Sequence, residues 1–306
     1  MRKALSMVLL FLGSFLLVVG LLARFWAPGE VKKTPLDVNS VMRLSGEALL
    51  FDGTALVRTP VRASSVTHAD SAKSDDDVVV FQNSSCLVKD PDNNAPDCVS
   101  ADDPQKRLIS ASTTHFATDR VTALAVNEAR YLPADATAVE GLVNKFPFDV
   151  EQKDYPFWDG LTGKAVPAVY SGEEDLDGVH VYRFVVNVVD GDITIGSDPG
   201  KYTTEKTMWV DATTGSILKQ SEHQVRKMAA TGQTVLDLDF EFTPETVANN
   251  VADAKDNGAR LTLLTQTVPL VGIIGGVLLL VMGFVLLPRE GVQNPAGQRR
   301  RVDTSA

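Results

Sequence analysis

Two uncharged apolar segments near the ends of the chain constrain its fold more than any other feature. Residues Ala4–Ala23 and Val268–Leu287 contain no Asp, Glu, Lys, Arg or His. Each has 20 residues, and at about 1.5 Å per residue such a helix crosses a hydrocarbon core of about 30 Å. We therefore predict two transmembrane helices, a large domain at 24–267, and short tails at 1–3 and 288–306.

Basic residues near the two spans predict their orientation. Arg2 and Lys3 precede the first span, and residues 299–301, all Arg, follow the second. Because basic residues near spans stay in the cytoplasm, we predict an inner-membrane protein with cytoplasmic termini and a periplasmic, extracytoplasmic domain. A cleaved signal peptide is the alternative for the first span. The apolar segment exceeds the usual ~7–15 residues and no A-x-A site follows, so an uncleaved anchor is favoured.

The chain has two cysteines, Cys86 and Cys98, on either side of a segment rich in Pro, Asn and Asp. These residues form turns, and a disulfide would close a 13-residue loop and stabilise the fold by about 3 kcal/mol. Disulfides persist outside the cytosol, which agrees with the predicted orientation. A metal-binding pair is the alternative, although no cluster of His or Cys residues lies nearby in the sequence.

Charge and motif content exclude several functions. The net charge of −10 disfavours nucleic acid, because phosphate binding needs a basic surface. None of the four histidines has a metal-ligand spacing, and there is no G-x-S-x-G elbow or Gly-rich phosphate loop. We therefore predict a non-enzymatic protein without cofactor or metal, and keep an enzyme of envelope lipids or glycans as a third hypothesis.

Strand patterns dominate between the spans. The clearest is Val235–Phe242, where Leu and Phe alternate with Asp and Glu from Leu236 onward. One face should therefore be buried and the other wet. An Asp-x-x-Thr sequence follows a strand pattern at both Asp119 and Asp211, which indicates either a recurring hairpin turn or a duplicated sheet motif. The predicted fold class is mainly β (α+β), a curved antiparallel sheet flanked by terminal transmembrane helices.

One helix is predicted before the second span, at 243–264. Thr243 can cap it and Pro244 suits its first position. Its apolar residues recur every three or four positions, so this stalk packs on the domain or on a partner. Gly272 and Gly276 form a G-x-x-x-G motif in the second span, which permits close approach of the first span or of another protein.

Five aromatic residues fall within 13 positions of a chain that is 7% aromatic. They are Phe146, Phe148, Tyr155, Phe157 and Trp158. One interpretation is a core corner, turned by the neighbouring prolines. The other is the apolar wall of a cleft for a lipid chain, which makes these five the candidate lipid-binding residues.

The same region carries a resemblance to a known family. The segments are Gly141–Val150, Tyr155–Gly160, Val166–Tyr170, Glu173–Phe184 and Trp209–Gly215. They resemble an actinobacterial envelope family, often labelled the porin PorA family, which includes a polar growth factor, and the likeness covers nearly the whole chain. The resemblance implies a protein of mycolic-acid-producing bacteria that takes part in traffic of the mycolate glycolipid trehalose monomycolate beside an MmpL-type exporter. It assigns no lipid-contacting residue.

The porin label conflicts with the sequence. A pore needs a closed barrel with a lipid-facing apolar band or a polar-lined helical bundle, whereas the spans are uncharged and the strands acidic. The preferred hypothesis is an envelope factor that binds or relays a mycolate glycolipid. The alternative is a protein scaffold of the polar growth machinery that binds no lipid. A closed core around the aromatic residues would favour the scaffold, and an open apolar groove the carrier.

Overall fold

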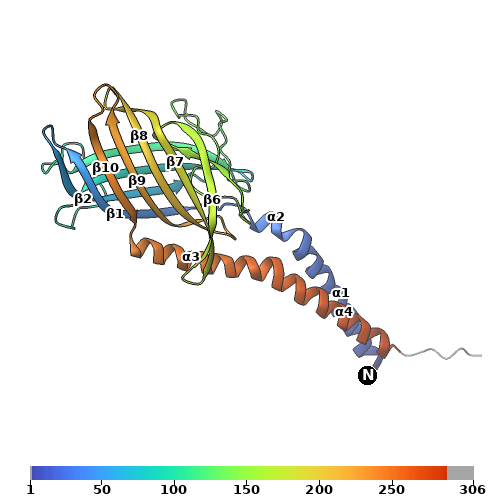
Figure 1. Cartoon of the computed structure of the whole chain (residues 1–306). Helices are drawn as coiled ribbons and strands as arrows, with labels where there is room; N and C mark the ends of the chain where they lie inside the picture. The colour runs from blue at the N-terminus through green and yellow to red at the C-terminus, as the bar shows by residue number, and fades with distance from the viewer. Residues whose placement is uncertain (1, 288–306) are drawn as a thin grey trace, which may run out of the picture. The chain divides into compact units, whose positions relative to one another are not determined.

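A computed structural model describes residues 2–287, and its main feature is one curved antiparallel sheet of ten strands (Figure 1). The predicted fold class is thereby confirmed. The sheet domain forms one compact unit at 29–261, and the terminal helices form another; the predicted tail 288–306 lies outside the described residues. The strands are β1 (Asn39–Phe51), β2 (Leu56–Ala69), β3 (Val78–Lys89), β4 (Leu108–Asp119), β5 (Tyr155–Asp159), β6 (Lys164–Leu176), β7 (Val179–Ile195), β8 (Asp198–Asp211), β9 (Ile217–Met228) and β10 (Thr234–Phe242). The helices are α1 (Arg2–Phe25), α2 (Ala27–Val31), α3 (Pro244–Thr262), the π-helical turn η1 (Leu263–Thr267) and α4 (Val268–Leu286).

The sheet consists of two meanders joined at one seam. The strand order is β4-β3-β2-β1-β10-β9-β8-β7-β6-β5, so β1 pairs with β10, for example Leu44 with Phe242. The edge strands β4 and β5 are connected by residues 120–154, which form isolated bridges to both edges: Ala125 pairs with Thr118 of β4, and Leu142 with Phe157 of β5. The irregular segment thus pairs locally with both edge strands, whose backbone groups would otherwise be unpaired at these positions.

The period-2 pattern of β10 divides the sheet into two faces. Leu236 and Leu238 are buried, whereas Asp239 and Glu241 on the opposite face are exposed, as the alternation predicts. We call the face that bears Leu238 the apolar face and the face that bears Asp239 the acidic face. The main core lies between the apolar face and the 120–154 connection.

A buried polar network interrupts the apolar face. The Glu222 carboxylate accepts hydrogen bonds from Tyr202 Oη at 3.2 Å and Thr204 Oγ1 at 3.1 Å and pairs with Lys206 Nζ at 3.4 Å. Burial and the nearby Glu222 carboxylate raise the pKa of Tyr202, which keeps this hydroxyl a donor. The network satisfies groups that would be costly to bury alone.

Helix α3 begins as the sequence predicts and packs on its own domain. Thr243 Oγ1 accepts a hydrogen bond from Thr246 N at 3.2 Å, which caps the first turn. The apolar residues Val247, Val251 and Ala254 of α3 contact β7, β8 and β9 on the acidic face. The apolar stripe of α3 therefore packs on the sheet domain. The π-helical turn η1 lies between α3 and α4. Pro269 of α4 has no backbone N–H to donate to the preceding turn.

A turn of sequence Asp-x-x-Thr occurs three times with the same hydrogen bonds. In each, the Asp carboxylate accepts from the backbone N and the Oγ1 of the Thr three residues later; the Asp residues are Asp119, Asp159 and Asp211. The next residue is left-handed each time, with φ of 59°, 66° and 75° at Ala123, Gly163 and Gly215. The recurrence reflects shared turn chemistry, and the third turn positions the aromatic segment because Phe146 N donates to Gly215 O at 2.8 Å.

The terminal helices α1 and α4 are both long and apolar enough to cross a membrane, and they pack against each other through small residues. The buried residues of α1 are Ser6, Gly13 and Gly20; those of α4 are Pro269, Gly272, Gly276 and Gly283. Gly20 lies against Gly272, and Gly13 against Gly276. The pair is therefore antiparallel, and Ser6 Oγ donates a hydrogen bond to Gly283 O at 2.8 Å.

Candidate functional site

Three of the five candidate lipid-binding residues lie in a closed core. Phe146, Phe157 and Tyr155 have exposed fractions of 0%, 6% and 8%. The Phe146 ring stacks on Phe184 at a centroid distance of 4.5 Å and meets Tyr155 edge-on at 5.4 Å. Buried in this way, the three rings present no surface to a lipid unless the core opens. Lipid binding by them stays a prediction that the geometry does not support.

The other two candidates, Phe148 and Trp158, are partly buried. Trp158 packs against the cluster of Phe81 and Phe116. The Lys145 ammonium lies over the Phe148 ring at 3.9 Å from its centroid, a cation–π contact. Burial lowers the pKa of Lys145 to about 8. The aromatic segment thus covers one end of the core and buries an amine, which an acyl-chain site would not contain.

The predicted disulfide is present and fastens a loop beside β1 and β2. Cys86 of β3 and Cys98 are bonded, with their Cα atoms 5.6 Å apart. The Asp97 carboxylate accepts two hydrogen bonds from Arg43 Nε and one from its Nη2, at 2.8–3.1 Å; Asp97 O accepts one from Ser64 Oγ at 2.7 Å. These contacts hold the loop that contains Cys98 against β1 and β2, so the disulfide has a structural role. Because the two sulfur atoms are bonded to each other, they do not form the alternative metal-binding pair in this state.

The predicted glycine pair of the second span faces α1. A Cβ atom added to Gly272 would lie 2.8 Å from Gly20 Cα, and one added to Gly276 would lie 2.7 Å from Leu17 N. Both distances are too short for a real side chain. The backbones therefore approach as closely as they do because both positions lack a Cβ, and α1 is the partner within the chain.

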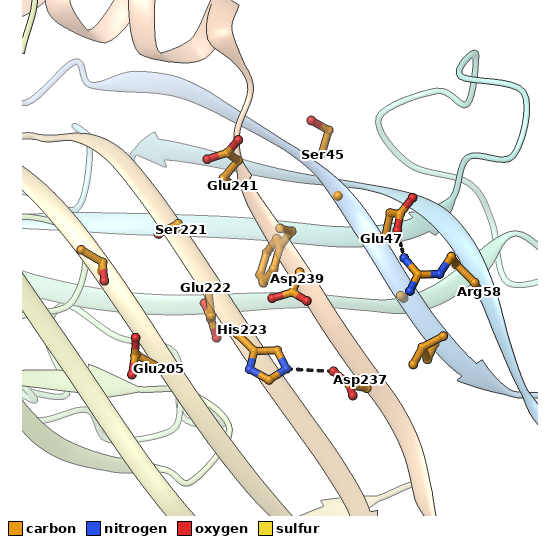
Figure 2. A pocket seen from close by; sticks show the side chains of 15 residues that line it. Ser45, Glu47, Arg58, Glu205, Ser221, Glu222, His223, Asp237, Asp239 and Glu241 are labelled. Atoms are coloured by element: carbon orange, nitrogen blue, oxygen red, sulfur yellow. Dashed lines mark hydrogen bonds and ion pairs between the residues drawn. The ribbon is translucent and has the colours of Figure 1, made fainter.

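An open groove lies on the acidic face, across β8, β9, β10, β1 and β2, with a volume of about 660 Å³. Figure 2 shows its polar side chains: Ser45, Glu47, Arg58, Glu205, Ser221, His223, Asp237, Asp239 and Glu241. Arg58 forms an ion pair with Glu47. Within residues 2–287, Glu205, Asp239 and Glu241 form no ion pair, so the groove carries uncompensated negative charge.

One histidine and two aspartates converge in this groove. His223 of β9 stands directly opposite Asp239 of β10 in the strand register, and Asp237 is two residues away on the same face. His223 Nε2 and Asp237 Oδ1 are 2.9 Å apart, with Asp239 beside them in Figure 2. The nearest ligand atoms of all three lie within 4.8 Å of one another. A nitrogen and two carboxylates at this spacing form a potential cation site.

Motifs of short spacing along the sequence do not reveal this cluster. His223 and Asp237 are separated by the whole β9–β10 turn, and only the register brings them together. The alternation of Asp237 and Asp239 was visible in the sequence, and pairing the adjacent strand patterns as a hairpin could have placed His223 opposite them.

A β-sheet domain joined to two helices that are long and apolar enough to cross a membrane fits the class of membrane-anchored proteins. The chain belongs to the porin PorA family, whose model, described as Porin PorA, matches residues 5–285. A protein named Porin PorA from Corynebacterium resistens is 23% identical over an alignment that covers 59% of this chain and 67% of the relative. The chain is therefore a porin-family protein, and its family includes a corynebacterial member.

Proposed function

We propose that the chain is a non-enzymatic, membrane-anchored factor of cell-envelope biogenesis whose sheet domain docks protein partners. The observation that carries this proposal is the contrast between the two faces of the sheet. The aromatic segment is packed into a closed core, while the acidic face presents an open, negatively charged groove. A charged groove selects partners of opposite charge and speeds their association.

The docking domain faces the extracytoplasmic side. The antiparallel arrangement of α1 and α4 supports this topology, because two antiparallel spans leave both chain ends on one side of the bilayer. Basic residues at those ends favour the cytoplasm, and the disulfide suits an oxidising compartment. An exposed residue at the β1–β2 hairpin tip, Thr54, provides the test. Thr54→Cys should react with a membrane-impermeant maleimide in intact spheroplasts, and protection until lysis would refute the topology.

The domain acts beside an MmpL-type exporter without carrying the glycolipid itself. The family resemblance suggests traffic of trehalose monomycolate, and a carrier must shield acyl methylenes worth about 0.8 kcal/mol each in water. The rings of Phe146, Tyr155 and Phe157 are buried in the core, so they provide no accessible apolar surface that could shield an acyl chain. Anchoring beside the exporter raises the effective concentration of a docking domain instead.

Two measurements on the full chain in nanodiscs separate docking from carrying. A photoactivatable trehalose monomycolate analogue should give no saturable labelling of residues 146–158, and the exporter should co-purify with the chain. Replacing Glu205 and Glu241 by Gln should weaken this co-purification, because they carry uncompensated charge in the groove. Saturable labelling of the aromatic segment would overturn the docking proposal in favour of the carrier.

A pore is the activity that the relative's name suggests, and the charge of the sheet argues against it. A strand that faces lipid needs an apolar outer band, but the acidic face carries Asp and Glu on β1, β8 and β10. Planar bilayers that contain the purified chain should therefore show no ion conductance above background, and reproducible unitary steps would show that the sheet or the helices can form a channel.

A further inference from the structure

We propose that His223, Asp237 and Asp239 bind one divalent transition-metal ion, with Zn²⁺ as the ion whose chemistry fits best. The site stands apart from the docking proposal and does not depend on it. Its ligands come from two adjacent strands in the middle of the sheet, where the hydrogen-bonded register fixes the positions of their Cβ atoms. A site built on paired strands is held more rigidly than one on loops.

The geometry requires little movement. In a tetrahedral zinc site the ligands lie about 2.0–2.2 Å from the metal, so neighbouring ligand atoms are roughly 3.4 Å apart. The nitrogen of His223 and the nearest oxygens of Asp237 and Asp239 already lie within 4.8 Å of one another. Small rotations of the three side chains would shorten these separations from 4.8 Å to the roughly 3.4 Å that zinc requires, and the fourth position opens toward the groove for water.

The ligand types select the metal. An imidazole nitrogen favours zinc, copper, nickel and iron, whereas magnesium and calcium prefer an all-oxygen set. One imidazole with two carboxylates gives a ligand set of charge −2, which neutralises a divalent ion. Glu205 and Glu241 in the same groove lack ion pairs among the described residues, so their field further attracts a cation.

The simpler interpretation is an ordinary His–Asp ion pair on a wet sheet face, and the chain contains a control for it. His180 Nε2 lies 3.5 Å from Glu173 Oε2, and that pair is also exposed but has no third ligand within the same reach among residues 2–287. If a histidine beside one carboxylate were sufficient, both pairs would bind metal equally. The proposal requires Asp239, which does not take part in the His223–Asp237 hydrogen bond.

Isothermal titration of the full chain in detergent, prepared without a histidine tag and stripped with chelator, tests the site with Zn²⁺ as the probe. We expect one zinc per chain. His223→Gln and Asp239→Asn should each weaken binding at least tenfold, while His180→Gln should leave the affinity unchanged. Near-UV circular dichroism of each variant checks that the fold is intact.

Two results would overturn the proposal. The first is binding that Asp239→Asn leaves unchanged, since this would reduce the site to a His–Asp pair. The second is zinc uptake that His180→Gln lowers as much as His223→Gln does, because an adventitious ion only would then explain the signal. Calcium or magnesium that competes with zinc at equal concentration would contradict the assigned metal class.

Discussion

The disulfide between Cys86 and Cys98 should stabilise the sheet domain by about 3 kcal/mol, chiefly by restricting the unfolded chain. The sequence separation is 12, so the closed loop has 13 residues when both cysteines are counted. In the chain-entropy model the lost entropy is about 2.1 + 1.5R ln 13, or roughly 9.7 cal/mol/K, which gives about 2.9 kcal/mol at 25 °C. The folded loop is also held by contacts to Arg43 and Ser64, which do not involve the sulfur atoms.

The two substitutions that remove the disulfide are chosen to suit the surroundings of each cysteine. Cys86 is buried among Val88, Ala95 and Leu108, so alanine avoids burying an unpaired hydroxyl there, whereas exposed Cys98 tolerates serine. Urea unfolding of the Cys86→Ala, Cys98→Ser double variant in detergent, followed by tryptophan fluorescence, should show the full loss. Reductant should shift the wild type by the same amount and leave the variant unchanged. A loss below about 1 kcal/mol, or wild-type stability insensitive to reductant, would refute the loop-entropy reasoning.

Three further experiments, two of them with a matched control substitution, test other parts of the structure. Gly276→Val should push α1 and α4 apart at a cost of about 1–3 kcal/mol, which increases the distance between spin labels on the two helices. Gly275→Val is the control, because a Cβ added there has its nearest atom at 4.0 Å. This control should leave the spin-label distance unchanged. Gly215→Ala places a Cβ 2.1 Å from the Phe146 carbonyl oxygen and should lower the free energy of unfolding in urea by about 3 kcal/mol or more. Gly163 has a similar φ but nothing within 4 Å of an added Cβ. Gly163→Ala should therefore lower the free energy of unfolding by only about 1–2 kcal/mol, through left-handed backbone strain. Because burial lowers the pKa of Lys145 from 10.5 to about 8, the unfolded chain holds a proton between those values that the folded chain has lost. Wild-type stability should therefore rise across pH 8–10.5, by on the order of 2 kcal/mol, and Lys145→Met should abolish that rise; equal pH profiles for both proteins would contradict the assigned burial.

Local sequence patterns predicted the features that depend on neighbours along the chain. The alternation in β10, the Thr243 cap, the two apolar helices and the disulfide all follow from residues a few positions apart. The spacing of Ser6, Gly13 and Gly20 would have identified the packing face of α1, since small residues every seventh position mark one helix stripe. The G-x-x-x-G motif of the second span by itself does not indicate this stripe of the first.

The rest depends on pairings between distant segments. Nothing local indicates that β1 lies beside β10, or that residues 120–154 join the two sheet edges. The His223 cluster exists only through the β9–β10 register. The aromatic segment could not be assigned from composition, because a core and a lipid cleft need the same apolar side chains, and only the packing around Phe146 separates them.

The single seam between β1 and β10 has a consequence for biosynthesis. Strands β1–β4 and β5–β10 can each form from hairpins between sequence neighbours. The two halves join only when β1 pairs with β10, the last strand of the sequence. Such a long-range contact is slow to form, and until Phe242 of β10 is available the edge of β1 stays unpaired and prone to aggregate. Correct folding of this chain therefore depends on rapid arrival of its C-terminal half or on a chaperone that covers the unpaired edge of β1.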